Sequence, residues 1–231
     1  MKIFKNIVSY FSRTELVLWS ASVILIAVSF CLFDRANYLS LAASLTGATS
    51  LIFNAKGNPF GQLLMVVFSI LYGIISYTFR YYGEMITYLG MTAPMAVFSL
   101  ISWLRNPYNG NKAEVEVNSL KGPETAFMLI LTAAVTAVFY FILKKAGTAN
   151  LFPGTLSVTT SFIAAYLTFR RSAYYALAYA LNDIVLIILW TLAALTDISY
   201  LSVIICFVMF LANDIYGYIS WSRMQKRQRQ K

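Results

Sequence analysis

Eight apolar runs, each close to the length that crosses a lipid bilayer, constrain the fold of this chain more than any other feature. A transmembrane helix needs about 20 predominantly apolar residues. Only short polar breaks separate most of the runs. They cover residues 16–33, 37–55, 60–79, 85–104, 124–143, 151–169, 173–193 and 198–221. The sequence therefore predicts an all-α integral membrane protein with eight spans.

Composition agrees with this reading and excludes several functions. Of the 231 residues, 59% are hydrophobic and 12% are charged, whereas a soluble domain is about half apolar and a quarter charged. The chain has no His, the commonest metal ligand and general base. Cys31 and Cys206 both lie inside apolar runs, so we expect neither a disulfide framework nor a metal site. We expect no cofactor, and no nucleic-acid partner because no soluble basic face exists.

The distribution of Lys and Arg predicts the orientation, because cytoplasmic loops carry the excess of these residues. One side of the membrane would hold 14 basic residues: Lys2, Lys5, Arg13, Lys56, Arg105, Lys112, Lys121, Arg170, Arg171, Arg223, Lys226, Arg227, Arg229 and Lys231. The other side would hold the remaining 4: Arg35, Arg80, Lys144 and Lys145. We therefore expect a multi-pass protein of the cytoplasmic membrane with both termini in the cytoplasm, which requires an even number of spans.

An internal repeat divides the chain. Residues 37–104 form three runs that end in ISW before Arg105, and residues 151–221 form three runs that end in ISW two residues before Arg223. A separation of 115 residues relates Lys56 to Arg171, and 118 residues relate Trp103 to Trp221. A single run, 124–143, joins the two sets, so the second would enter the membrane in the same direction as the first. Parallel repeats place a substrate path between the halves.

This repeat predicts a layout of five parts. They are an amphipathic segment with an extra transmembrane helix at 1–36, a first three-helix repeat at 37–104, a cytoplasmic linker with a connecting helix at 105–150, a second three-helix repeat at 151–222, and a basic cytoplasmic tail at 223–231.

Two acidic residues lie within the spans, where an ionised carboxylate costs roughly 2.5–3.5 kcal/mol on insertion scales. Asp183 follows Asn182, and Asp214 follows Asn213. Other polar and aromatic side chains recur beside them at helical spacing. They are Tyr175, Tyr179 and Trp190 on the seventh run and Tyr216 on the eighth.

These side chains suit a flat, polar solute. A heteroaromatic ring stacks on Tyr or Trp, amides and carboxylates hydrogen-bond ribose hydroxyls, and an acid favours a cationic ring. The free-energy cost of burying the acid would then be offset by water in the cavity or by the ligand itself. A structural role stays open for both pairs, because Asn and Asp also join helices and aromatic residues anchor span ends.

Several segments resemble the PnuC-type transporters of nicotinamide riboside, a family related to the SWEET sugar facilitators. They are SLTGATSLIFNAKGNPFGQLLMVVFSILYGIISYTFRYYGEM (44–85), TAPM (92–95) with Trp103, TSFIAAYLTFRRS (160–172), ALNDIVLIILW (180–190) and NDIYGYISW (213–221). The resemblance covers about residues 37–224, and the run 16–33 looks like an extra N-terminal helix. Gln62 and Tyr72, in the first segment, join the candidate substrate-binding residues.

The resemblance implies a 3+1+3 helix order, passive uptake of a vitamin-like nucleoside that is trapped by phosphorylation, and a homotrimer. Many family members carry a Trp-x-x-Trp-x-x-x-Asn pattern on the seventh run. Here Tyr175 and Ala178 replace the two Trp residues, and Asn182 matches. Tyr179 could supply the missing ring.

Competing functions follow from these observations. Nicotinamide riboside is the first candidate substrate. Related proteins carry thiamine, riboflavin or deoxynucleosides, so these are the alternatives. A membrane-embedded enzyme is disfavoured by the absence of His, of an HExxH-type motif and of a Gly-rich phosphate loop. A structural or receptor subunit without transport is the remaining class.

Overall fold

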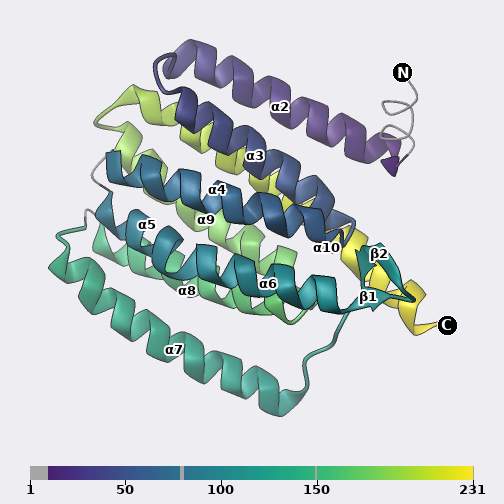
Figure 1. Cartoon of the computed structure of the whole chain (residues 1–231). Coiled ribbons are helices and arrows are strands. Elements are labelled where there is room, and N and C mark those ends of the chain that lie inside the picture. Colours follow the sequence, from purple (N-terminus) through teal and green to yellow (C-terminus); the bar gives the residue numbers. More distant parts are fainter. Residues whose placement is uncertain (1–9, 79–80, 149, 231) are drawn as a thin grey trace.

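The computed structural model describes residues 10–78, 81–148 and 150–230, and within these ranges the chain is almost entirely helical (Figure 1). Its helices are α2 (Arg13–Phe33), α3 (Tyr38–Ala55), α4 (Pro59–Thr78), α5 (Tyr82–Thr87), the π-helical turn η1 (Tyr88–Thr92), α6 (Ala93–Arg105), α7 (Gly122–Lys145), α8 (Leu151–Phe169), α9 (Tyr175–Ala194), the 3₁₀ turn η2 (Ile198–Tyr200) and α10 (Leu201–Arg229). Two strands, β1 (Pro107–Tyr108) and β2 (Asn111–Val115), pair antiparallel. Of the basic residues counted above, Lys2, Lys5, Arg80 and Lys231 lie outside the described ranges, as does most of the predicted amphipathic segment.

Seven helical segments of the described chain are long and apolar enough to cross a membrane, with α5, η1 and α6 forming one of them and η2 with α10 another. The helix absent from this set is α3, which has 18 residues and is rich in Ser, Thr and Gly. It packs against α2, α4 and α10, so small residues are needed on several faces (Figure 1). At Gly47 an added Cβ would lie 2.3 Å from the ring of Phe210. All eight predicted runs are therefore helices, and seven have the length and hydropathy of a span.

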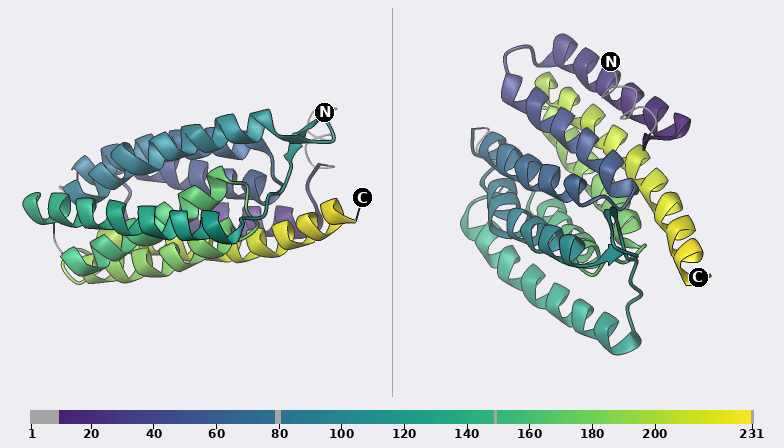
Figure 2. Two further views of the ribbon diagram at one scale, coloured as in Figure 1. Left: turned by 90° about the horizontal axis from the view of Figure 1, so that it is seen from below. Right: turned by 45° about the vertical axis from the view of Figure 1, so that its right-hand side comes forward.

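Six helical segments form a closed ring. In order around the ring, α3 packs against α4, α4 against α6, α6 against α8, α8 against α9, α9 against α10, and α10 against α3. The remaining two long helices lie outside it, with α2 against α3 and α10, and α7 against α8. Figures 1 and 2 show α2 and α7 on opposite sides of the bundle. The ring encloses the region where sequence analysis places a substrate path.

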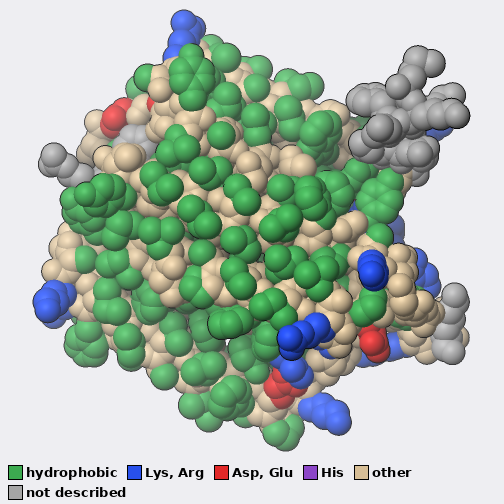
Figure 3. Space-filling model, in the orientation of Figure 1, with side chains coloured by type: hydrophobic (Ala, Val, Ile, Leu, Met, Phe, Trp, Pro, Cys, Tyr) green, Lys and Arg blue, Asp and Glu red, His purple; other side chains and the backbone are tan. Residues whose placement is uncertain are grey.

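The surface has the distribution expected of a membrane protein. Hydrophobic side chains cover most of the face in Figure 3, and the charged side chains lie at its edges. Most of them gather at the end that carries the strands and the end of α10, called the linker end from here on. The start of α2 lies at the same end.

The segment of residues 111–118, called the strap from here on, crosses the linker end and joins both halves of the ring. Gly57 and Arg171 follow α3 and α8 in the left-handed conformation, with φ of 67° and 57°. The carbonyl of Gly57 accepts the N–H of Val115, and the carbonyl of Arg171 accepts the N–H of Asn118, each at 2.9 Å. Gln228 of α10 holds the strap from the other side, because its Oε1 accepts the N–H of Val117 at 2.8 Å. The predicted polar linker is thus an ordered structural part, and α10 continues as a helix well past the predicted span end at 221.

Two tryptophans make matching ties across the ring. Trp103 of α6 donates its indole N–H to the carbonyl of Thr168, near the end of α8, at 2.9 Å. Trp221 of α10 donates its indole N–H to the carbonyl of Asn54, near the end of α3, at 2.7 Å. Both rings are fully buried and their centroids are 5.2 Å apart. Each ISW motif therefore binds the end of the first helix of the other predicted repeat.

The serines beside these tryptophans repeat the pattern. Ser102 donates to the carbonyl of Phe169 at 2.8 Å, and Ser220 donates to the carbonyl of Ala55 at 2.7 Å. The two ISW motifs therefore recur because their Ser and Trp side chains make the same hydrogen bonds at the linker end.

Candidate functional site

Asn182 lies in the middle of α9 and faces α8. Its Oδ1 accepts hydrogen bonds from Thr160 Oγ1 at 2.8 Å and from Ser161 Oγ at 3.0 Å. The side chain is 3% exposed. A buried amide held through its oxygen keeps its NH₂ group in a fixed direction. Asn182 is therefore a positioned polar group inside the bundle.

The neighbouring carboxyl group, Asp183, faces α10. It lies beside the carboxyl group of Asp214, and both residues are 4% exposed. Asp183 Oδ2 has no further partner. Two carboxyl groups that lie close together in a low-dielectric interior repel each other when both are ionised. The two acids that the sequence singled out thus form one unit inside the bundle.

Aromatic side chains surround the end of α9 that lies away from the linker end. Trp190 packs against Tyr81 and Tyr200, with ring centroids 5.0 and 5.4 Å apart. It also contacts the edge of Tyr72 at 6.3 Å. The hydroxyl of Tyr72 and the indole N–H of Trp190 are both buried without a hydrogen-bond partner. Buried donors of this kind are costly unless a ligand or water satisfies them.

The pocket between these rings is closed. Tyr72, Trp190 and Phe207 line it together with Cys206, and its volume is about 10 Å³. That volume is close to the space of a single water molecule. A nucleoside enters this part of the ring only if the aromatic side chains move.

A second aromatic cluster closes the linker end. Tyr175 packs edge-on against Trp221 at 4.8 Å and against Trp103 at 6.3 Å. Tyr179 lies one turn further along α9 and contacts Tyr175 at 6.3 Å. Ala178, the departure from the family pattern, is buried beside them. The described conformation is therefore closed by aromatic rings on both sides of Asn182 and Asp183.

The other predicted site residues have partners that tie helices together. Gln62 donates to Asn54 Oδ1 at 2.9 Å and so joins α4 to α3. Asn213 donates to Ser22 Oγ at 2.9 Å, and the hydroxyl of Tyr216 donates to Glu15 Oε1 at 3.1 Å. Both acceptors belong to α2, outside the ring. The structure thus brings Asn182 and Asp183 together with Asp214, and it turns Asn213 and Tyr216 toward α2.

The structure adds residues that sequence analysis missed. Tyr88 lies in the π-helical turn, is buried, and packs against Tyr72 with centroids 4.3 Å apart. Glu84 is 4% exposed, and its Oε2 has no partner. It lies in the first turn of α5, at the start of the span, so the sequence gives it the position of an ordinary span-end acid. The signal available in the sequence was Pro94, because a proline disturbs the regular helix in the turn that precedes it. The π turn occupies that preceding turn, and π turns occur often at functional sites.

No three His, Cys, Asp or Glu side chains of the described residues come together in a way that could hold a metal ion. The polar groups inside the ring are instead amides, hydroxyls, carboxyls and aromatic rings. Such groups persist within an apolar bundle where a polar solute is bound or passes through. The fold and the site together define a multi-pass membrane transporter.

Comparison with known proteins identifies the family within this class. The model of the family described as "Nicotinamide mononucleotide transporter" matches residues 37–223, and the chain belongs to that family. The match contains the ring helices from α3 to α9 and α10 as far as residue 223, and it leaves α2 outside. Two relatives are named nicotinamide riboside transporter PnuC. The one from Neisseria mucosa is 29% identical over 84% of this chain and 76% of its own length. The one from Haemophilus influenzae is 24% identical over 91% of each chain.

A solved structure has the same fold. The crystal structure of the vitamin B3 transporter PnuC superimposes with a TM-score of 0.81 and 26% identity, covering 94% of each chain. The resemblance stated from the sequence segments is confirmed by these comparisons.

Proposed function

We propose that this protein mediates facilitated uptake of nicotinamide riboside across the cytoplasmic membrane, and that it acts as a transporter without catalytic activity. The observation that carries the proposal is the Asp183–Asp214 pair inside the ring. A carboxylate at this position complements the single positive charge of a nicotinamide ring. Family membership and the names of the relatives support the same substrate.

The proposed site combines this charge with an amide and with rings. Asn182 would hydrogen-bond the ribose or the carboxamide through its NH₂ group. Tyr179 would contact the flat ring, and Trp190, about three turns further along α9, would line the path with its unpartnered N–H. Tyr72, Tyr175 and Gln62 remain candidates of the same site, and Asn213 and Tyr216 would act on it through α2. Substrate entry then requires the aromatic clusters to separate.

We also propose the 3+1+3 organisation with parallel repeats. The swapped ties of Trp103 and Trp221 support it. So does the equivalence of Gly57 and Arg171, which both follow a helix in the left-handed conformation and bind the strap. This equivalence aligns Lys56 with Arg170, one residue before the position that the sequence spacing had indicated.

Both termini are proposed to be cytoplasmic. The start of α2 and the end of α10 lie at the linker end, where most of the described basic residues lie (Figures 1 and 3). A homotrimer is proposed from the family resemblance, and light scattering of the purified protein in detergent tests it.

Uptake into liposomes that contain only this protein tests the function. Radiolabelled nicotinamide riboside should accumulate to equilibrium, and unlabelled nicotinamide riboside should compete with it better than thiamine, riboflavin or a deoxynucleoside. A liposome without transport would indicate a structural or receptor subunit. Preferential transport of a deoxynucleoside or another vitamin would keep the transporter class and replace the substrate. The replacement of both family Trp residues, by Tyr175 and Ala178, is the reason to include these competitors.

A further inference from the structure

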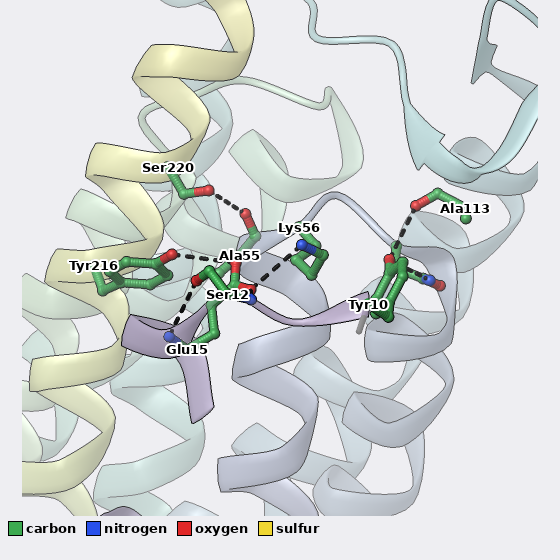
Figure 4. A network of polar contacts seen from close by, with 9 residues as sticks. Tyr10, Ser12, Glu15, Ala55, Lys56, Ala113, Tyr216 and Ser220 are labelled. Atoms are coloured by element: carbon green, nitrogen blue, oxygen red, sulfur yellow. Dashed lines mark hydrogen bonds and ion pairs between the residues drawn. The ribbon is translucent and has the colours of Figure 1, made fainter. Parts of the chain in front are cut away.

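A polar cavity lies at the linker end, outside the ring, between the start of α2, the strap and α10. Its volume is about 380 Å³, within the range of small-molecule sites. Figure 4 shows the polar network at its wall, where Lys56 lies between Tyr10 and Glu15 and Tyr216 approaches Glu15 from α10. Ser220, which ties α10 to α3, lies in its wall, whereas the proposed substrate path runs inside the ring and does not cross this cavity.

The uncompensated charge of the cavity is positive. Lys56 is paired with Glu15 at 3.3 Å, and Arg227 is paired with Glu114. Arg223 also lines the cavity and is exposed, and it has no hydrogen-bond or ion-pair partner among the described residues. Because each carboxylate already has a cation, the remaining guanidinium is available for an anion from outside the chain.

An apolar groove continues from the same place. It has a volume of about 580 Å³ between α2 and α10, and Val17, Ile215 and Ile219 line it with exposed fractions of 69%, 52% and 42%. Arg13 lies in its wall at the start of α2, also without a partner among the described residues. Tyr216 lines both the groove and the polar cavity, so the two are contiguous.

We propose that one anionic phospholipid binds here, with its phosphate at Arg223 and Arg13 and an acyl chain in the groove between α2 and α10. A free phosphate compound would leave the apolar groove unused. A zwitterionic lipid would leave the positive charge without a partner. Basic pockets between helices at the cytoplasmic surface are known to select acidic headgroups. The bound lipid would hold α2, which lies outside the family match, against the ring beside the Glu15–Tyr216 hydrogen bond.

Native mass spectrometry of the delipidated full chain tests this inference with phosphatidylglycerol and phosphatidylcholine of identical acyl chains. We expect preferential binding of phosphatidylglycerol. Each of Arg13→Ala and Arg223→Ala should weaken that binding roughly fivefold, as about 1 kcal/mol for each basic residue near an acidic lipid predicts. The matched control is Arg105→Ala, which removes an exposed basic residue at the same end that lines neither cavity. It should have no effect.

A second pair of variants tests the acyl chain. Ala212→Phe places a ring in the groove and should weaken binding of both lipids, whereas Ala134→Phe on the exposed face of α7 should not. Equal binding of the two lipids by the unaltered protein would overturn the proposal, as would equal losses in Arg105→Ala. Displacement of phosphatidylglycerol by equimolar glycerol phosphate would also overturn it, because the site would then recognise a soluble phosphate.

Discussion

The four tryptophans allow a direct test of the hydrogen bonds that hold the ring. Trp103 and Trp221 are buried with bonded N–H groups, Trp190 is buried with an unpartnered N–H, and Trp19 is 38% exposed and donates to Thr49. Each Trp→Phe substitution removes the N–H together with part of the ring. The loss of ring contacts is similar at the three buried positions, so differences among them report on the N–H.

The magnitude follows from the partners. The carbonyls of Asn54 and Thr168 each keep a second donor, the N–H of Gly57 and of Arg171, both at 2.9 Å. Losing the indole bond therefore costs only the net worth of one hydrogen bond, about 0.5–1.5 kcal/mol. At Trp190 the substitution removes an N–H that has no hydrogen-bond partner among the described residues, so no bond within the protein is lost. Trp103→Phe and Trp221→Phe should thus be less stable than Trp190→Phe by about 0.5–1.5 kcal/mol.

The chain supplies its own reporter for this measurement. Cys31 is exposed and Cys206 is buried, and these are the two cysteines of the chain. In a Cys31→Ser background, a thiol-reactive fluorogenic dye reports unfolding by labelling Cys206 as the protein is heated in detergent.

We expect Trp103→Phe and Trp221→Phe to lower the midpoint of thermal unfolding by equal amounts, and Trp190→Phe to melt about 1–6 °C above them. Trp19→Phe also loses a hydrogen bond, to Thr49, but at an exposed position, so it should lower stability by only about 0.5 kcal/mol, the lower end of that range. If the unfolding midpoint of Trp190→Phe falls as far as those of Trp103→Phe and Trp221→Phe, the reasoning from bonded and unbonded N–H groups is refuted. Unequal effects at Trp103 and Trp221 would refute their structural equivalence.

Three further outcomes test the site and the topology. Asn182→Ala should weaken nicotinamide riboside binding about tenfold or more, as measured by calorimetry, while Thr49→Ala on the outer side should not; normal binding would remove Asn182 from the site. Asp183→Asn should reduce affinity for cationic nicotinamide riboside more than for a neutral deoxynucleoside, and equal losses would indicate hydrogen bonding without charge recognition. An enzyme reporter fused to the C-terminus should be active only if it is a type that works in the cytoplasm; activity of a periplasmic reporter would reverse the proposed orientation.

The number of helices, their approximate bounds and the family follow from the sequence alone. Hydrophobic length is a local property, and a helix in a bilayer satisfies its own backbone hydrogen bonds, so each span can be read without knowing its neighbours. The repeat was also visible, because ISW recurs at the end of each half. The acid Asp183 beside the amide Asn182 marked the polar part of α9, because a carboxylate is rare within an apolar run.

Which side chains of different helices contact each other is seen only in the tertiary structure. Adjacent residues on a helix point about 100° apart, so the sequence could not tell that Asn182 faces α8 while Asp183 faces Asp214 on α10. It also grouped Asn213 and Tyr216 with the substrate site, although their side chains bond to α2. The strap across the linker end was invisible for a similar reason. Its bonds join backbone groups that lie far apart in the chain, and no local pattern of side chains encodes them.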